Sequence, residues 1–309
     1  MNDNKGIIPM PRHFLSILDL DKDTAHALVK RAKEMKECDF HSDLLAGKTV
    51  ALIFEKASTR TRVSFEVGIN HLGGNSLLMT PAESQLGRSE PLSDTSRVLS
   101  RYCAGMVVRT FGQEIVDELS HYASVPVINA LTDMYHPCQV MSDMLTMYER
   151  TPDLANLKVA WVGDGNNMAH SFINAAILFG YELVLACPEG YDPDPNLMAH
   201  AKAEGARVTL VRTPEEACEG AHYVNTDVWA SMGQEEEQKQ REAAFAGFMI
   251  DDDMLAVADS EVKVMHCLPA HRGEEISEEV FESERSIVFD QAENRLHMQK
   301  AIMEWIFSE

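Results

Sequence analysis

The feature that most constrains the fold is the alternation of short apolar runs with longer amphipathic stretches along the chain. Such alternation is typical of βαβ units, in which helices connect the parallel strands of a buried sheet. In the first half of the chain, helical patterns begin near Arg60, Pro91, Gln113 and Pro137. The strands predicted before and between these patterns are Thr49–Phe54, Ser76–Met79, Met106–Arg109 and Val125–Asn129. Together they predict one parallel sheet flanked by helices.

A second series of apolar runs predicts a second parallel sheet. Its strands are expected at Lys158–Val162, Leu183–Ala186, Val208–Val211, Tyr223–Asp227, Val262–His266 and Ile287–Phe289. The turn-forming sequence Thr151–Asp153 separates the two series, and 309 residues suffice for two domains of ordinary size. We therefore expect an α/β protein with two three-layer domains, residues 1–149 and 150–290. Helical periodicity also predicts an N-terminal helix around Ala25–Met35 and a closing helix over Gln291–Phe307.

Charge and cysteine usage narrow the class of protein. Asp and Glu number 49 against 27 Lys and Arg, and the net charge of −22 repels nucleic acids and anionic membranes. No apolar run approaches the roughly 18–20 residues of a transmembrane helix, and the N-terminus lacks the apolar core of a signal peptide. The six cysteines occur singly, without C-x-x-C spacing. We expect a soluble protein of a reducing cytoplasm, with neither nucleic acid nor membrane as a partner.

The segment Ser58–Arg62 is the sharpest local signal for function. It follows the predicted strand Thr49–Phe54 and lies where a helical pattern begins. A helix N-terminus offers free N–H groups and the positive end of the helix dipole to an anion, and Arg60 can donate two hydrogen bonds to phosphate oxygens. The segment therefore predicts a phosphate site, with a Ser/Thr helix cap beside two solvated arginines as the alternative. The nucleotide-binding pattern G-x-x-x-x-G-K-[ST] is absent from the chain.

Polar side chains at two further strand ends favour the same anion site. Arg109 ends a predicted strand, which places it at the crevice where open α/β sheets bind ligands. After the next strand, His136 precedes Pro137, a residue favoured in the first helical turn, and Gln139 follows. Imidazole and amide groups can together polarise a carbonyl and bind an amide. A structural helix cap is the alternative for His136 taken alone.

Two strand ends in the second half carry polar groups suited to an amino acid. The turn Gly163–Asn167 begins like a dinucleotide fingerprint, but Met168 replaces the last glycine of G-x-G-x-x-G, so no dinucleotide site is predicted. Asn167 can bind the backbone groups of an amino acid, and Asp227 can bind a cationic amine. The charge-rich run 234–242 predicts a solvated helix face, with a mobile lid as the alternative.

Cys267 follows a predicted strand and precedes the X-Pro bond Leu268–Pro269. A zinc site built from His266, Cys267 and His271 is disfavoured, because neighbouring strand residues point to opposite faces and no second cluster has ligand spacing. A cysteine nucleophile is the other alternative, although no protease or glutamine-hydrolase signature accompanies Cys267. The chemistry of this segment therefore depends on the wider context.

Seven motifs, in order over almost the whole chain, resemble those of the ornithine carbamoyltransferases. They are FEKASTRTR, SQLGR, VVRTFG, YHPCQ, GDGNN, DVWASMG and MHCLPAHRGEEI. STRTR with HP-x-Q marks the wider aspartate/ornithine carbamoyltransferase superfamily, whereas D-x-x-x-S-M-G and HCLP mark the ornithine branch. The resemblance implies a carbamoyl-phosphate domain, an amino-acid domain and a final helix, 291–309, that returns to the first domain. It also implies a homotrimer or an assembly of trimers, with active sites shared between subunits.

The resemblance further implies which residues bind the substrates. For carbamoyl phosphate they are Ser58, Thr59, Arg60, Thr61, Gln85 of a neighbouring subunit, Arg109, His136, Pro137, Cys138, Gln139, Cys267, Leu268 and Arg295. For L-ornithine they are Asn167, Asp227, Ser231 and Met232. The implied catalytic residues are Arg109, His136, Asp227 and Cys267. Leu268–Pro269 is expected to be a cis peptide, and no motif position departs from the family pattern.

The reaction implied is carbamoyl transfer from carbamoyl phosphate to the side-chain amine of L-ornithine, giving L-citrulline and phosphate in arginine metabolism. The amine has a lysine-like pKa of about 10.4, so it must lose a proton before it attacks. No metal or organic cofactor is expected, because carbamoyl phosphate is already activated. A carbamoyltransferase for putrescine or an acylated ornithine is the nearest alternative, although DVWASMG is intact. A dehydrogenase is disfavoured by Met168, and a non-catalytic oligomer would not need so many reactive side chains at strand ends.

Overall fold

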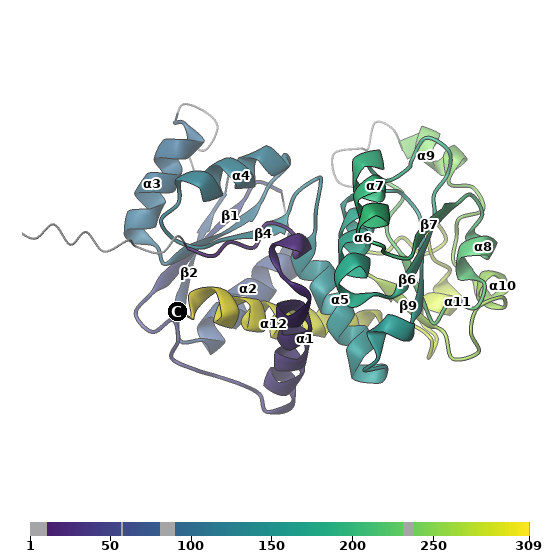
Figure 1. Ribbon diagram of the computed structural model, residues 1–309, viewed down its shortest axis with the longest axis horizontal. Helices are drawn as coiled ribbons and strands as arrows, with labels where there is room; N and C mark the ends of the chain where they lie inside the picture. Colours follow the sequence, from purple (N-terminus) through teal and green to yellow (C-terminus); the bar gives the residue numbers. More distant parts are fainter. Residues whose placement is uncertain (1–10, 57, 81–89, 231–237, 309) are drawn as a thin grey trace, which may run out of the picture.

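The computed structural model describes residues 11–56, 58–80, 90–230 and 238–308, and it contains two parallel sheets, each in its own domain (Figure 1). The first sheet has the order β2-β1-β3-β4, with β1 Thr49–Phe54, β2 Asn75–Met79, β3 Gly105–Arg109 and β4 Val127–Leu131. The second has the order β7-β6-β5-β8-β9, with β5 Lys158–Val162, β6 Glu182–Ala186, β7 Val208–Val211, β8 Tyr223–Thr226 and β9 Lys263–His266. Two parallel sheets were the expectation, and it is confirmed.

Helices flank both sheets and connect their strands. The helices that precede β5 in the chain are α1 Lys22–Glu37, α2 Thr59–His71, α3 Leu92–Tyr102, α4 Gln113–Tyr122 and α5 Pro137–Arg150. The later ones are α6 Asn167–Phe179, α7 Pro195–Ala203, α8 Pro214–Cys218, α9 Gln238–Ala244, α10 Asp252–Leu255, α11 Glu278–Phe281 and α12 Val288–Phe307. Short 3-10 turns occupy Ile17–Asp19 and Leu154–Asn156. None of these helices is long and apolar enough to cross a bilayer.

Alternation along the strands explains the layers. In β1, Ala51 and Ile53 pack with the α3 and α4 side chains, whereas Val50 and Leu52 pack with α2 on the other face. Such a strand is apolar on both faces, as parallel strands covered by helices require. The second sheet is built in the same way, with α6 on one face and α8 on the other. Helices thus cover both faces of each sheet, and the prediction of three layers in each domain is confirmed.

One predicted strand is wrong and another is displaced. Ile287–Phe289 does not form a strand, because α12 begins at Val288. The chain pairs with β9 only at Ser286, and Ile287 donates one bond to the Val264 carbonyl before the helix starts. The strand expected at Val125–Asn129 begins instead at Val127, after Pro126, which has no N–H for the ladder.

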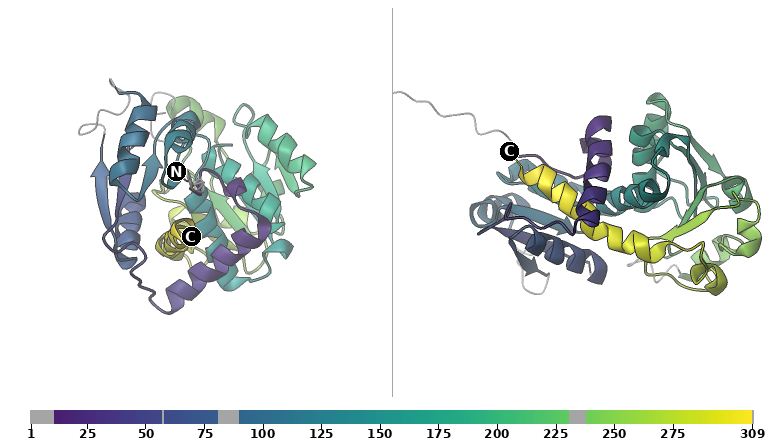
Figure 2. Two further views of the ribbon diagram at one scale, coloured as in Figure 1. Left: turned by 60° about the vertical axis from the view of Figure 1, so that its left-hand side comes forward. Right: turned by 90° about the horizontal axis from the view of Figure 1, so that it is seen from below.

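The C-terminal helix joins the two domains. It begins beside β9 of the second sheet and runs against α1, α2 and α5 (Figures 1 and 2). Its inward face is buried at Met298, Ala301 and Ile302. The return of this helix to the first domain is therefore confirmed, and it carries Arg295 toward the strand ends of the first sheet.

In each sheet the strand order reverses at one central strand, because the chain first adds strands on one side of it and later adds strands on the other side. β1 lies between β2 and β3, and Phe54 at its end is paired with Arg109. β5 lies between β6 and β8, and Val162 is paired with Thr226. In open α/β sheets, the carboxyl ends of strands at such a reversal form the ligand-binding crevice. The two sheets thus supply two adjacent places for ligands.

Candidate active site

The N-terminus of α2 forms the first part of the site. Ser58 is the N-cap residue, yet its side chain makes no capping hydrogen bond, so the alternative of a simple Ser/Thr cap does not describe it. Ser58 is half-buried, Thr59 is exposed and Thr61 is buried. The first-turn N–H groups of α2 and these hydroxyls are donors suited to an anion.

Guanidinium groups from three elements converge on this helix start. Arg109 of β3 donates from Nη1 to the Thr61 hydroxyl at 3.4 Å, and Arg295 of α12 donates from Nη2 to the same oxygen. Burial, reinforced by the Arg295 charge, lowers the pKa of Arg109 to about 10, and burial likewise lowers the pKa of Arg295 to about 10. Arg60 is close enough to contribute to both shifts. At neutral pH these groups remain cationic, so the cluster is suited to a multiply charged anion.

His136 lies at the start of α5 as a neutral imidazole. Pro137 begins α5, as predicted, and His136 is the N-cap residue, although its side chain makes no capping hydrogen bond. The backbone N–H of His136 donates to the Ser171 hydroxyl of α6 at 2.8 Å. Burial, and then the charges of Arg295 and Arg109, hold the pKa of His136 well below 6.5. Its Nδ1 atom has no hydrogen-bond partner among the described residues. A neutral ring close to two arginines can donate a hydrogen bond to a developing oxyanion.

The residues after His136 point inward. The Cys138 thiol is fully buried and donates to the Asn129 carbonyl at 3.4 Å, and burial raises its pKa to about 12. Its side chain therefore belongs to the core, and only its backbone can face a ligand. Gln139 is also fully buried and donates from Nε2 to Asp143 at 2.8 Å. Its Oε1 atom has no partner in the described part of the chain.

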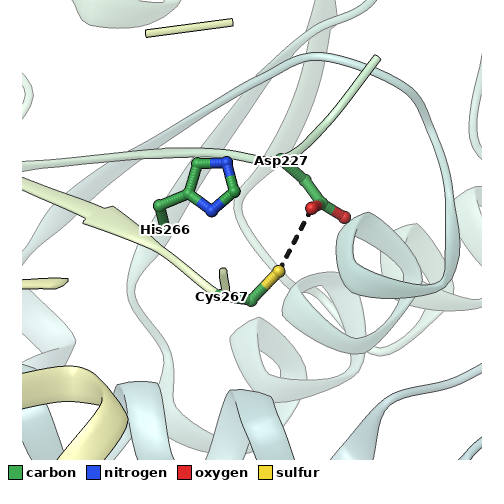
Figure 3. A group of neighbouring side chains, drawn as sticks. All are labelled: Asp227, His266 and Cys267. Atoms are coloured by element: carbon green, nitrogen blue, oxygen red, sulfur yellow. Dashed lines mark hydrogen bonds between the residues drawn. The ribbon is translucent and has the colours of Figure 1, made fainter. Parts of the chain in front are cut away.

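The second sheet contributes a carboxylate at the end of β8. Asp227 accepts a hydrogen bond from Asn166 Nδ2 at 3.1 Å. It accepts another from the Cys267 thiol at 3.1 Å, which Figure 3 shows as a dashed line. Burial, and then the negative charge of Asp227, raise the pKa of Cys267 well above 9. A thiol held in this form is a donor to Asp227 rather than a thiolate, which argues against a cysteine nucleophile.

The expectation that His266 and Cys267 point apart is wrong. Ligand atoms of Asp227, His266 and Cys267 lie within 4.8 Å of one another, because Cys267 follows the end of β9 and strand alternation no longer applies (Figure 3). Both ring nitrogens of His266 are nevertheless engaged. Nδ1 accepts from the Leu268 N–H at 2.8 Å, so Nε2 carries the hydrogen and faces Glu275 at 3.1 Å. A metal ion at this cluster would have to displace one of these bonds.

The remaining predicted residues fall into two groups. Asn167 begins α6 and donates to the Thr132 carbonyl at 2.6 Å, and Leu268–Pro269 is a cis peptide, as expected. Leu268 itself has a φ of 62°. Three other positions, Gln85, Ser231 and Met232, lie outside the described residues.

Several supporting residues escaped the sequence analysis. Asp143 accepts hydrogen bonds from Gln139 and from Gln291 of α12, each at 2.8 Å. Asn166 binds Asp227, and Ser171 binds the His136 backbone. Asp143 alone leaves a signal in the sequence, since it is a charged residue four positions after Gln139, on the same helix face and among apolar neighbours.

The arrangement has two chemically distinct sides. Cations, helix N–H groups and a neutral imidazole come from the first domain and α12, and a carboxylate comes from the second. The Cys267 thiol donates to Asp227 and lies close enough to Arg109 and Arg295 to interact electrostatically with both, so the two sides meet at this residue. Such a site can hold an anionic acyl donor next to an amine.

Two family models match nearly the whole chain. Residues 12–149 match the aspartate/ornithine carbamoyltransferase carbamoyl-P binding domain. Residues 155–306 match the Asp/Orn binding domain of the same family.

Individual proteins give the same result. The chain is 64% identical over 300 residues to an ornithine carbamoyltransferase of Nitratidesulfovibrio vulgaris, covering 97% of this chain and 100% of that protein. It is 65% identical over 297 residues to one from Oleidesulfovibrio alaskensis, covering 96% and 99%. The solved ornithine carbamoyltransferase of Pyrococcus furiosus superimposes with a TM-score of 0.92 at 42% identity, covering 96% of this chain and 97% of that one.

Proposed function

The chain belongs to the aspartate/ornithine carbamoyltransferase family, and we propose that the crevice between its two sheets is the active site. Its activity is carbamoyl transfer from carbamoyl phosphate to the side-chain amine of L-ornithine, which yields L-citrulline and phosphate. One observation carries the placement of the site: the buried guanidinium groups of Arg109 and Arg295 meet at Thr61 beside Arg60. Like charges buried together are costly unless an anion compensates them, and carbamoyl phosphate is such an anion.

The phosphate group of carbamoyl phosphate binds at the start of α2. Ser58, Thr59 and Thr61 supply hydroxyls and backbone N–H groups, and the three arginines supply charge-assisted hydrogen bonds. Because phosphate is also the leaving group, the same donors stabilise the charge that develops on it in the transition state. No metal is needed for this role, since fixed cations already surround the phosphate.

The carbamoyl group lies between α5 and the Cys267–Pro269 turn. Arg109 and His136 donate to its carbonyl oxygen, on which negative charge grows as the amine attacks. Gln139 and the Leu268 carbonyl accept from its NH₂ group, and the backbone of Pro137 and Cys138 closes the pocket. Holding the donor and the amine in contact accounts for much of the rate, because the reaction then becomes effectively intramolecular.

Ornithine binds on the second-domain side. Asp227 binds the side-chain amine of ornithine in its cationic form and, with the Cys267 thiol, orients this amine for attack after it has lost a proton. Asn167 binds the backbone groups of the amino acid. On the strength of the motif DVWASMG we add Ser231 and Met232 to this set. The attacking amine must be neutral, so kcat/KM for ornithine rises between pH 6 and 8 as more of the amine is deprotonated.

The larger organisation follows the same proposal. The domains are residues 1–149 with the returning helix 291–309, and residues 150–290. Ser58 and Thr59 line an open groove of about 410 Å³ together with Arg62 and Glu66, so the first turn of α2 can be reached from outside the chain. Gln85 of a neighbouring subunit enters there in a homotrimer or an assembly of trimers. All six cysteines are free thiols, which favours a cytoplasmic location.

Parallel assays with three amines test the function. Citrulline should form rapidly from carbamoyl phosphate and L-ornithine, whereas putrescine and N-acetylornithine should react at least about a hundredfold more slowly, since each lacks or masks the amino-acid groups bound by the second domain. Faster carbamoylation of putrescine or N-acetylornithine would contradict the proposed substrate. The assays require no added metal or cofactor.

A further inference from the structure

Asp143 is a fully buried carboxylate in α5, one helical turn after Gln139. Its Oδ1 atom accepts a hydrogen bond from Gln139 Nε2 and another from Gln291 Nε2, each at 2.8 Å. Its Oδ2 atom has no hydrogen-bond partner within the described ranges. A carboxylate in such a place is costly, so its retention beside Gln139 asks for an explanation.

The chemistry of the two groups fixes the direction of the Gln139 amide. Burial raises the pKa of Asp143 to about 7, so both its protonated and its ionised form occur at neutral pH. In either form Oδ1 only accepts, because the proton of the neutral form can reside on the unpartnered Oδ2, whereas an amide has a donating nitrogen and an accepting oxygen. Asp143 therefore holds the Gln139 nitrogen, and the Oε1 atom is directed away from Asp143. Oε1 is itself buried and unpartnered among the described residues, so it is complementary to an N–H donor.

We propose that Asp143 is a positioning residue that keeps Gln139 Oε1 facing the NH₂ group of carbamoyl phosphate. The site thereby recognises a carbamoyl group by its N–H donors and disfavours acyl phosphates that lack them, such as acetyl phosphate. This inference rests on the proposed function, in which Gln139 contacts the carbamoyl group. Without an acceptor-only neighbour, the amide can turn and present its own NH₂ group to that of the substrate.

A second contact holds Asp143 itself in place. Gln291 of α12 donates from Nε2 to Asp143. Its Oε1 atom accepts from the backbone N–H of His266 at 2.8 Å, and His266 directly precedes Cys267. The orientation of Gln139 is therefore set by a network that includes α5, α12 and the end of β9. The network leaves Gln139 Oε1 and Asp143 Oδ2 without partners among the described residues, and Oε1 is the atom that can accept from an N–H group of the substrate.

The test compares two phosphates in two variants. Asp143→Asn and Asp143→Leu are neutral and close in shape to Asp, so both should fold, as thermal unfolding can verify. Dissociation constants are measured for carbamoyl phosphate and, as a competitor, for acetyl phosphate. We expect about a tenfold loss of carbamoyl-phosphate affinity in both variants, with acetyl-phosphate affinity changed by less than about twofold.

Thr146→Val is the matched control. Thr146 is fully buried in α5, one turn beyond Asp143, and accepts from Asn294 of α12 at 3.0 Å. The variant removes the bond to Asn294 and the bond that the Thr146 hydroxyl donates to the Ser142 carbonyl, and neither involves Gln139, so both dissociation constants should be unchanged. Equal losses for both phosphates in the Asp143 variants, or no loss for either, would overturn the inference.

Gln139→Met separates this inference from the proposed function. If Gln139 contacts the carbamoyl group, Gln139→Met weakens carbamoyl-phosphate binding, and adding Asp143→Asn to it produces no further loss. Unchanged binding in Gln139→Met would refute the proposed role of Gln139. If Gln139→Met weakened carbamoyl-phosphate binding and the double variant weakened it by the full additional amount, only the positioning role of Asp143 would be refuted. The proposed role of Gln139 would then stand.

Discussion

The buried arginines show how the chemistry of single residues depends on their surroundings. Arg109 and Arg295 each keep a positive charge at neutral pH although burial lowers their pKa to about 10. The same two charges help to keep His136 neutral. An anion that enters this cluster therefore meets fixed cations and a neutral donor, which are the groups required to bind a phosphate and polarise an acyl carbon.

The neighbouring arginines Arg60 and Arg62 offer a matched pair of variants. Arg60→Ala should weaken carbamoyl-phosphate binding by about 1.5–3 kcal/mol, because it removes a charge-assisted contact at the cluster. Arg62 is exposed and ion-paired with Glu66 one turn along α2, so Arg62→Ala should cost less than about 0.5 kcal/mol. Calorimetric titration with carbamoyl phosphate measures both. Similar losses in the two variants would mean that general charge, rather than Arg60, binds the phosphate.

The neutral state of His136 predicts a pH dependence of stability. In the folded chain its pKa lies well below 6.5, so only the unfolded chain takes up this proton as the pH falls through that value. Its contribution to stability is therefore present above about pH 6.5 and is lost below it. Relative to the wild type, His136→Gln should gain up to about 1.4 kcal/mol in unfolding free energy per pH unit between 6.5 and 5. Urea titrations that give parallel pH profiles for the two proteins would contradict this.

Residues at strand ends were predictable, and their supporting partners mostly were not. Arg109, His136 and Asp227 each follow an apolar run, and a parallel sheet brings such positions together. Asn166 and Ser171 are ordinary polar residues near a helix start, and nothing in their spacing indicates that they bind Asp227 and the His136 backbone. The first contact depends on how neighbouring strand ends meet within the second domain and the second on how the two domains pack, and local periodicity encodes neither.

At the scale of elements, the close approach of α2 and α12 brings together the groups proposed to bind phosphate. α2 carries Arg60 and Thr61, and α12 carries Arg295, which donates to Thr61. The helices meet at Gly68, where an added Cβ atom would lie 3.0 Å from Met303 Cε and 3.5 Å from Lys300 Cγ. The absence of a side chain at Gly68 thus sets the separation of the two helices.

Gly68→Val tests the consequence of this spacing. Its branched side chain should force the helices apart, lower the unfolding free energy by about 1–3 kcal/mol and weaken carbamoyl-phosphate binding. Gly68→Ala is the control, because the flexible end of Met303 can move away and alanine favours the helix by up to about 1 kcal/mol. Urea unfolding measures the change in unfolding free energy, and titration with carbamoyl phosphate measures the change in its binding. Unchanged binding in a folded Gly68→Val protein would refute the coupling between helix spacing and the site.

The error at Ile287–Phe289 also belongs to this scale. Short apolar runs do not distinguish a strand from the buried first turn of a helix. Here Ile287 and Val288 are buried, but Phe289 is 65% exposed, which fits a helix and not a strand buried on both faces. Helix α12 consequently begins at Val288, before the predicted start at Gln291, and the helix predicted from Gln291 to Phe307 is confirmed.

At the scale of the whole molecule, the proposed ring of subunits makes a quantitative prediction. If each site takes Arg60 from one chain and Gln85 from its neighbour, as proposed, inactive Arg60→Ala and Gln85→Ala proteins should complement each other. After dissociation and random reassembly of an equal mixture, about a quarter of the wild-type activity should return, because each interface has one chance in about four of combining two intact residues. No recovery despite demonstrated subunit exchange would place both residues in a single chain's site.

The division of the site between two domains is tested most directly by measuring both substrates in Arg60→Ala and Asp227→Asn. The quantities are the dissociation constant of carbamoyl phosphate and kcat/KM for ornithine at saturating carbamoyl phosphate. Asp227→Asn should lower kcat/KM for ornithine by about 10- to 100-fold and change the carbamoyl-phosphate dissociation constant by less than about twofold. Arg60→Ala should weaken carbamoyl-phosphate binding more than it lowers kcat/KM for ornithine at saturating carbamoyl phosphate. If both variants weakened both substrates equally, the anion site and the amine site would not be separate, and the proposed division would be wrong.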